Sequence, residues 1–231
     1  MSGGNPGMRN ILRRLERAYG RREWKCWGNG VDVLVDTILS QNTSAANSIA
    51  GFRKLRRQFR SWTRVAAAPV EEVARAIRIS GLSNLKAPRI QAILRRIKAD
   101  RGKLDLQFLS AMDEQKAYEY LRRFPGVGPK TANCVLLFAF GLPVFPVDTH
   151  IHRIAIRLGL IPPDTTADEA HDLLKPLIRP EDRYATHVLL IAHGRKTCKA
   201  PNPACGRCSL LDLCPFGRRR VESDRTLREE H

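Results

Sequence analysis

Apolar residues recur at helical spacing along most of this chain. Leu12, Leu15 and Tyr19 share one face of a segment that runs from Met8 to about Tyr19, with arginines between them. The same period, with Pro69 opening one segment and Asp113 capping another, predicts further helices at residues 45–59, 69–79, 86–98, 113–124, 130–140, 149–158, 167–177 and 184–192. Residues 33–39 form a mostly apolar stretch that fits either a strand or a buried helix. Because no segment alternates apolar and polar residues with a period of two, we predict an all-α fold.

Basic residues greatly outnumber acidic ones. The 231 residues include 40 Lys and Arg against 23 Asp and Glu, a net charge of +17, while 43% hydrophobic residues suffice for a folded core. This excess favours binding to a polyanion, and we interpret it as nucleic-acid binding; an anionic membrane surface is the weaker alternative. The arginine-rich runs 53–64 and 89–103 fit a DNA contact and a solvated helix face equally well. The charged end, 218–231, is predicted to fray.

The chain shows no signal for export. Residues 1–8 are rich in glycine and lack the apolar stretch of a secretory signal, and no apolar run approaches the ~20 residues of a membrane span. We therefore expect an intracellular, cytoplasmic protein that is not secreted and has no membrane partner. Its six cysteines are then not expected to form disulfides. Cys26 and Cys134 have apolar neighbours and are predicted to be core residues.

Four cysteines lie close together near the C-terminus. Cys198, Cys205, Cys208 and Cys214 have the spacing C-x6-C-x2-C-x5-C, which can wrap one metal centre. A zinc ribbon usually has two close C-x2-C pairs and this segment has one, so the spacing favours a [4Fe–4S] cluster. Lys199 and other basic residues lie between or just before these cysteines, which favours a loop folded for phosphate contact over an electron-transfer site.

A glycine-rich turn, Phe124-Pro125-Gly126-Val127-Gly128-Pro129, separates two predicted helices. Gly126 and Gly128 allow a sharp turn and close approach of a partner, and Pro129 suits the first position of a helix. The N–H groups at such a helix start can bind a phosphate. A plain helical hairpin would explain the glycines equally well.

Lys130 falls in the first turn of the second of these helices. The positive end of the helix dipole disfavours an ammonium there, so we expect a lowered pKa for Lys130. A partly neutral amine is a nucleophile that can form a Schiff base, although a lysine that merely pairs with phosphate is the simpler interpretation.

Asp148 follows eighteen residues later, where another helix should begin. Its structural role would be an N-cap, and its functional role would be a carboxylate that supports positive charge at a sugar carbon. The two roles are compatible. The histidines lack the spacing of a helical metal pair, and we interpret them as structural or DNA-facing: His150, His152, His187 and His193.

Together these motifs resemble the helix–hairpin–helix DNA glycosylase superfamily, and within it the endonuclease III family. The resemblance rests on the hairpin at 121–133, the Val-Asp-Thr-His motif at 147–150, the four-cysteine spacing, and two upstream segments, 38–43 and 79–87. It covers about residues 9–216. Three separated motifs in the right order make a chance agreement improbable.

The resemblance implies a two-domain helix–hairpin–helix glycosylase fold with a C-terminal iron–sulfur cluster loop. Residues 31–142 would form a six-helix barrel domain that ends in the hairpin, and 1–30 with 143–231 would form the cluster domain with its frayed tail. The protein would be a monomer that binds double-stranded DNA containing damaged bases or abasic sites and flips the damaged base out of the duplex.

The resemblance also assigns roles to single residues. Lys130 would attack the sugar C1′, expel a damaged pyrimidine, which we expect to be oxidised, and nick the strand by β-elimination, with Asp148 stabilising the positive sugar. Gln41 and Leu82 match positions that fill the gap in the duplex. Gly126, Val127 and Gly128 in the hairpin, and Lys199 in the cysteine loop, would contact DNA.

Other functions stay open at this point. In adenine-removing relatives a catalytic glutamate falls near Asp36, which we interpret as structural or pocket-lining because Lys130 is present. The alternatives are a glycosylase for adenine or mismatched thymine that only removes the base, a non-catalytic DNA-binding iron–sulfur module, and a redox carrier. The pairing of Lys130 with Asp148 argues against the non-catalytic module.

Overall fold

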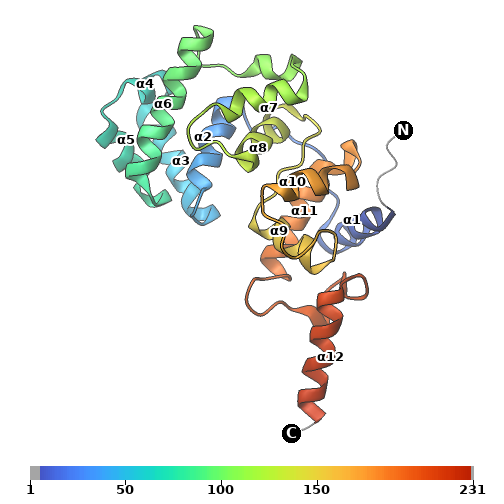
Figure 1. The fold of residues 1–231 in the computed structure, drawn as a ribbon. Helices are drawn as coiled ribbons and strands as arrows, with labels where there is room; N and C mark the ends of the chain where they lie inside the picture. The colour runs from blue at the N-terminus through green and yellow to red at the C-terminus, as the bar shows by residue number, and fades with distance from the viewer. Residues whose placement is uncertain (1–5, 230–231) are drawn as a thin grey trace. The chain divides into compact units, whose positions relative to one another are not determined.

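The structure, a computed structural model, describes residues 6–229. Over that range its regular elements are α-helices and short 3-10 helices, which confirms the all-α prediction (Figure 1). The α-helices are α1 (Pro6–Tyr19), α2 (Gly30–Ser40), α3 (Ala45–Phe59), α4 (Trp62–Ala67), α5 (Val70–Ala76), α6 (Ser83–Arg101), α7 (Glu114–Arg122), α8 (Pro129–Phe140), α9 (Thr149–Arg157), α10 (Glu169–Leu174), α11 (Arg183–Lys196) and α12 (Pro215–Glu229). The 3-10 helices are η1 (Arg78–Ser80), η2 (Gln107–Ala111), η3 (Lys175–Leu177), η4 (Pro180–Asp182), η5 (Cys205–Arg207) and η6 (Leu211–Leu213).

The chain divides into two compact units, residues 25–142 and the segments on either side of them. The first unit begins at Lys25 rather than at the predicted residue 31. Trp27 explains the difference, because its ring stacks on Phe138 of α8 with the centroids 3.9 Å apart. The segment that leads into α2 is therefore held by the unit to which α2 belongs.

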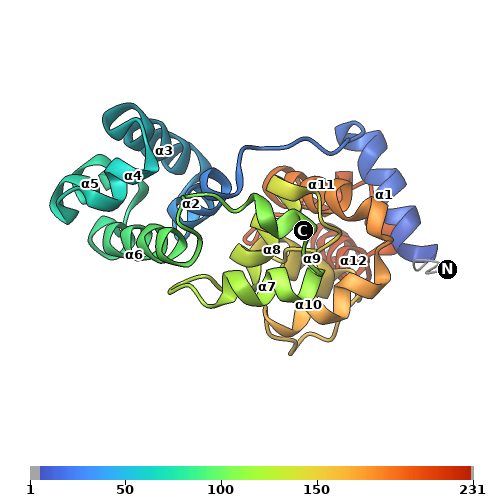
Figure 2. The same cartoon turned by 90° about the horizontal axis from the view of Figure 1, so that it is seen from above.

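The first unit is built around α2, which contacts α3, α6 and α8 (Figure 2). The apolar stretch 33–39 is thus a helix buried on most sides, which is why its pattern lacks a polar face. Asn29 caps this helix, because its side chain accepts a hydrogen bond from the N–H of Asp32. Nine of the twelve residues of α8 are buried as well, so α2 and α8 form the centre of this unit.

The second unit joins α1 to the helices that follow residue 142. Leu15 of α1, Phe145, Ile151 of α9 and Leu189 of α11 belong to one buried apolar cluster. Helix α11 contacts both α1 and α9, so residues from the two ends of the chain share this core.

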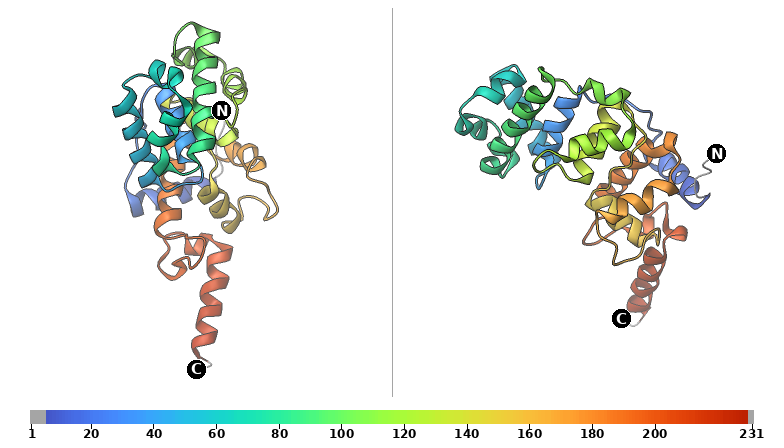
Figure 3. Two further views of the ribbon diagram at one scale, coloured as in Figure 1. Left: turned by 90° about the vertical axis from the view of Figure 1, so that its left-hand side faces the viewer. Right: turned by 45° about the horizontal axis from the view of Figure 1, so that its top comes forward.

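The C-terminal segment differs from its prediction. The predicted frayed end at 218–231 is helical as far as Glu229, and its last two residues lie outside the described range. This helix, α12, continues directly from the loop that carries the cysteines (Figure 3). Its first turn is anchored, because the guanidinium of Arg157 lies 4.5 Å from the ring centroid of Phe216. Among residues 6–229, none of the helices combines the length and the apolar character that crossing a bilayer requires.

Candidate functional site

The glycine-rich turn of the first unit joins α7 to α8. Gly126 has a φ of +73°, the left-handed region that favours glycine, whereas Gly128 has an ordinary φ of −81° and is the N-cap of α8. Pro129 occupies the start of α8, as predicted. Val127 is only 3% exposed, so at this position only the main chain is available to a partner.

The start of α8 has the properties of an anion-binding helix end. The N-cap, Gly128, provides no side-chain acceptor for the first N–H groups of the helix. The carbonyl oxygen of Val127 instead accepts a hydrogen bond of 2.8 Å from the guanidinium of Arg122, which fixes the turn. N–H groups left without a side-chain cap at the positive end of a helix dipole favour a phosphate oxygen.

Gln41 lies against this turn. Its Nε2 donates hydrogen bonds of 3.2 Å to the carbonyl oxygen of Gly126 and 3.2 Å to Oγ1 of Thr131. Arg89 of α6 donates to its Oε1 at 3.3 Å. The structure therefore brings one predicted gap-filling residue to the hairpin, although the two are 85 residues apart in the sequence.

Leu82 occupies a second loop of the same unit. It precedes α6, has left-handed backbone angles (φ 50°, ψ 32°), and its side chain is 51% exposed. An apolar side chain held at a helix start and open to solvent is unfavourable in water. Its exposure is compatible with the predicted insertion into a duplex.

Lys130 is half-buried at the second position of α8, and Asp36 of α2 lies within its electrostatic influence. Burial raises the pKa of the Asp36 carboxyl, and the positive charge of Lys130 opposes that rise. The sequence marked Asp36 as structural or pocket-lining, and the structure couples it to the predicted nucleophile.

Asp148 belongs to the second unit and caps α9, as predicted. Its Oδ1 accepts a hydrogen bond of 2.9 Å from the N–H of Ile151. The preceding N–H, of Val147, donates to Nε2 of His171 at 3.0 Å, and Nδ1 of that ring contacts the carbonyl oxygen of Ala167 at 3.0 Å. His171 is therefore the tautomer with its proton on Nδ1, and it fixes the main chain just before the half-buried Asp148.

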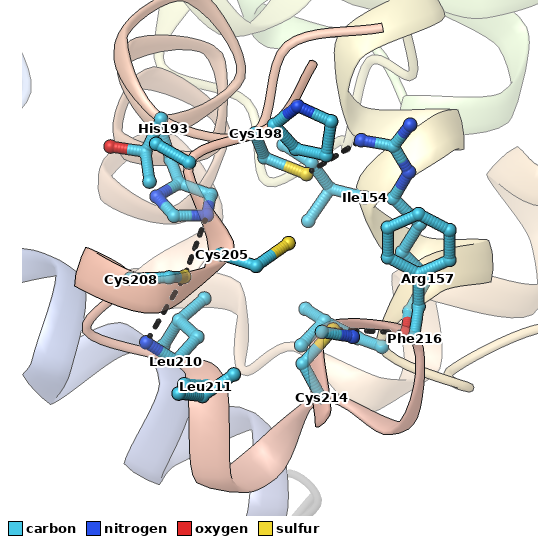
Figure 4. A pocket seen from close by; sticks show the side chains of 15 residues that line it. Ile154, Arg157, His193, Cys198, Cys205, Cys208, Leu210, Leu211, Cys214 and Phe216 are labelled. Carbon is cyan, nitrogen blue, oxygen red and sulfur yellow. Dashed lines mark hydrogen bonds between the residues drawn. The ribbon is translucent and has the colours of Figure 1, made fainter. Parts of the chain in front are cut away.

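The four clustered cysteines line one pocket of the second unit (Figure 4). The walls between them are mostly apolar and include Ile154, Leu158, Leu210, Leu211 and Phe216. Burial raises the pKa of the Cys208 thiol to about 11 and also raises the pKa of the Cys205 and Cys214 thiols. Without a metal these three thiols are protonated at neutral pH, so a metal must displace protons to bind them.

Hydrogen-bond donors already point at the sulfur atoms of this pocket. The N–H of Leu210 lies 3.4 Å from Sγ of Cys208, the N–H of Gly217 lies 3.3 Å from Sγ of Cys214, and Arg157 donates to Sγ of Cys198 at 3.3 Å. Such donors stabilise thiolates that ligate iron. Among residues 6–229, no three His, Cys, Asp or Glu side chains converge on a point where a single metal ion could bind. Four cysteine thiols around one pocket form a donor set that can ligate a metal centre.

Comparison with known proteins decides the family. The model of the HhH-GPD superfamily of base excision DNA repair proteins matches residues 35–180. Endonuclease III of Sulfolobus acidocaldarius is 36% identical over 186 residues, which are 80% of this chain and 81% of that protein. Endonuclease III of Thermotoga maritima is 37% identical over 193 residues, 83% of this chain and 85% of that protein. The chain belongs to the HhH-GPD superfamily.

A solved structure supports the same assignment. A trapped covalent intermediate of an endonuclease III with DNA superposes on this HhH-GPD protein with a TM-score of 0.79 and 31% sequence identity. The match covers 93% of this chain and 97% of that one. The resemblance inferred from the sequence motifs is thereby confirmed.

Sequence patterns missed or misplaced some residues of this HhH-GPD protein. Lys86 of α6 is only 1% exposed. The sequence signal for its burial is its position on the same helical face as the buried Ile90 and Ile93. The prediction for Cys134 is confirmed, but Cys26 is exposed rather than buried. Cys26 lies in the non-helical segment before α2, where its thiol donates to the carbonyl oxygen of Gly28 at 3.3 Å.

Three more predicted residues are an exposed lysine of the cysteine loop and two buried histidines of the second unit. Lys199 is exposed in the cysteine loop, and its carbonyl oxygen accepts a hydrogen bond of 2.8 Å from Arg157. His187 and His193 are buried, so the structural interpretation holds for both. His193 belongs to the pocket wall, with Nε2 at 3.8 Å from Sγ of Cys208. Burial lowers its pKa to about 4.

Proposed function

We propose that this protein is a bifunctional DNA glycosylase and AP lyase of base excision repair. The observation that carries the proposal is Lys130 at the second position of α8, the second helix of the hairpin. The chain that carries it is 31% identical to an endonuclease III that has been trapped covalently on DNA. A protein that only binds DNA needs no lysine nucleophile. The substrate is double-stranded DNA with a damaged base or an abasic site, and the protein acts on the DNA of the cell.

Lys130 is the nucleophile of this proposal. Its neutral Nζ forms a bond to C1′ of the damaged nucleotide, and the bond from C1′ to the base breaks with its electron pair leaving on the base. The sugar ring opens to an imine between Nζ and C1′. Loss of a proton from C2′ then expels the 3′ phosphate, so the strand is nicked on the 3′ side of the lesion.

Asp148 stabilises the positive charge that develops on the sugar. Its carboxylate keeps a second oxygen available, because the bond to the N–H of Ile151 uses Oδ1. A carboxylate near an oxocarbenium or iminium carbon lowers the energy of that state by direct electrostatic attraction.

The DNA contacts follow from the chemistry of the first unit and of the cysteine loop. We assign phosphate binding to the main chain of Gly126, Val127 and Gly128, and to the exposed Lys199. Gln41 and Leu82 enter the space that the flipped nucleotide leaves. The protein is expected to act as a monomer.

The four cysteines fit a [4Fe–4S] cluster, which we propose as the resident cofactor. When bound, such a cluster contributes folding free energy to the loop that holds it. Cys198, Cys205, Cys208 and Cys214 supply the thiolates, and the N–H groups of Leu210 and Gly217 with the guanidinium of Arg157 stabilise their charge. The loop so folded presents Lys199 to DNA.

Incision of a panel of defined duplexes tests the function. The panel contains thymine glycol, dihydrouracil, an abasic site, an adenine mismatch and a thymine mismatch. We expect excision of the oxidised pyrimidines and nicking of the abasic duplex, with the unsaturated sugar end that β-elimination leaves. Base removal without nicking on all five duplexes would contradict the lyase assignment.

A further inference from the structure

A buried ammonium group ties together the two loops that carry Gln41 and Leu82. Lys86 is 1% exposed and lies in the first turns of α6. Its Nζ donates hydrogen bonds of 2.8 Å to the carbonyl oxygen of Leu39 and 2.8 Å to that of Ser80. Leu39 lies two residues before Gln41, and Ser80 lies two residues before Leu82.

Burying a lysine is unfavourable, so its retention needs a reason. Removing an ammonium from water costs several kcal/mol unless hydrogen bonds compensate. Both acceptors here are neutral main-chain carbonyls, and burial lowers the pKa of Lys86. A well-packed apolar residue of similar volume would fill the same space in the core at a lower desolvation cost. What the ammonium adds is a fixed link between two chain segments.

Both linked loops contain a non-glycine residue in a left-handed conformation. Asn42 has a φ of 53° and Leu82 a φ of 50°. Such conformations cost about 1–2 kcal/mol per residue and persist only where the surroundings hold them. Ser80 adds to this restraint, because its buried Oγ donates to the carbonyl oxygen of Asn47 at 3.3 Å.

We propose that Lys86 is a positioning residue that holds the Gln41 loop and the Leu82 loop at one separation, so that both side chains enter the duplex together when the damaged base leaves it. This rests on the proposed function. Without the link each loop has to be ordered as the damaged base leaves the duplex, and fixing the main chain of even one residue costs about 1–2 kcal/mol. Base extrusion is the step that this cost would slow.

The chain offers a matched control on the same helix. Gln91 is 2% exposed, and its Nε2 donates hydrogen bonds of 2.8 Å to the carbonyl oxygens of Val65 and Ala68. It thus ties α6 to the end of α4, as Lys86 ties it to the end of α2. Lys86→Met and Gln91→Met both replace two buried hydrogen bonds by an apolar side chain, but only the first releases the loops of Gln41 and Leu82.

The experiment measures melting temperature, affinity for undamaged DNA, and single-turnover excision with 2-aminopurine placed beside the lesion to report unstacking. We expect both variants to bind undamaged DNA like the wild type and to lose comparable thermal stability. Lys86→Met should excise about tenfold more slowly, equivalent to about 1.4 kcal/mol, and lose the fluorescence rise, whereas Gln91→Met should keep both. Lys86→Gln, which keeps N–H donors on a shorter stem, gives a second variant with the same expected pattern and a smaller loss.

Equal slowing by the Lys86 and Gln91 variants, or slowing by neither, would overturn the proposal and leave Lys86 with a stabilising role only. Reductive crosslinking of the wild type to a preformed abasic site is measured in parallel. A wild type that crosslinks while the Lys86 variants behave like the Gln91 variant contradicts this inference alone. A wild type that neither crosslinks nor excises contradicts the proposed function itself.

Discussion

Gly128→Ala separates what the fold requires at the hairpin from what DNA requires. In the free protein a Cβ at this position would have Nη1 of Arg122 as its nearest neighbour, at 3.7 Å, an ordinary van der Waals distance. The φ of −81° suits any residue. Alanine is a poorer N-cap than glycine, but it also reduces the entropy of the unfolded chain by about 0.4–1 kcal/mol. We therefore expect a stability change within about 0.5 kcal/mol.

The effect on DNA binding should be much larger. A methyl group at the cap would keep a phosphate from the first N–H groups of α8, and a hydrogen bond to a charged group contributes about 1.5–3 kcal/mol. Affinity for undamaged duplex should fall about ten- to a hundredfold, and the salt dependence should decrease by about one phosphate contact. Fluorescence anisotropy across a salt series, with thermal unfolding of the same protein, measures both quantities.

Gly126→Ala is the contrasting variant. There φ is +73°, and a Cβ would lie 2.3 Å from Cζ of Arg89, so this substitution should lose about 1–2 kcal/mol of stability. If Gly128→Ala binds DNA as the wild type does, the start of α8 is not a phosphate site. If it unfolds as readily as Gly126→Ala, the geometric argument for Gly128 is wrong.

Three further outcomes follow from the buried titratable groups and the cysteine pocket. Asp36→Asn should stabilise the protein at neutral pH. Burial raises the pKa of Asp36, so the wild type loses stability as pH rises through that pKa, and the variant should not. A variant whose melting temperature varies with pH as that of the wild type does would contradict this. Burial lowers the pKa of His171 below its usual 6.5, so the native state binds fewer protons than the unfolded state and stability should fall as pH drops below about 6.5. His171→Gln should reduce that fall. Identical curves of melting temperature against pH for the variant and the wild type would count against this prediction. Cys208→Ser should lower the iron content from about four per chain and reduce thermal stability, and stoichiometric zinc without iron in anaerobically prepared wild type would refute the cluster.

Local signals explain why much of the fold could be predicted from the sequence. The start of α8 is set by Pro129 at its first position, and that of α9 by the cap at Asp148. Ser44 caps α3 by accepting a hydrogen bond from the N–H of Asn47. Each of these depends on residues within one helical turn, so the pattern alone is sufficient.

Features that depend on distant partners could not be predicted. The hydrogen-bond partners of Lys86 are carbonyl groups at residues 39 and 80, and the position of Gln41 depends on a turn 85 residues away. Helix α12 was missed because it is charged on most sides, so it has no apolar stripe; its first turn is held by Arg157. Cys26 has apolar neighbours in the sequence, yet the segment that contains it is exposed and forms no helix.

Borohydride trapping on abasic duplex DNA tests the central claim most directly. Borohydride reduces an imine to a stable amine, so the wild type should form a covalent protein–DNA crosslink whose DNA-bearing peptide contains Lys130. Lys130→Gln keeps a polar side chain without a nucleophilic amine, and it should bind the duplex yet neither crosslink nor nick it. A Lys130→Gln protein that still crosslinks would move the nucleophile elsewhere. A wild type that excises bases but never crosslinks would make this a base-removing glycosylase and Asp36 its candidate acid–base group.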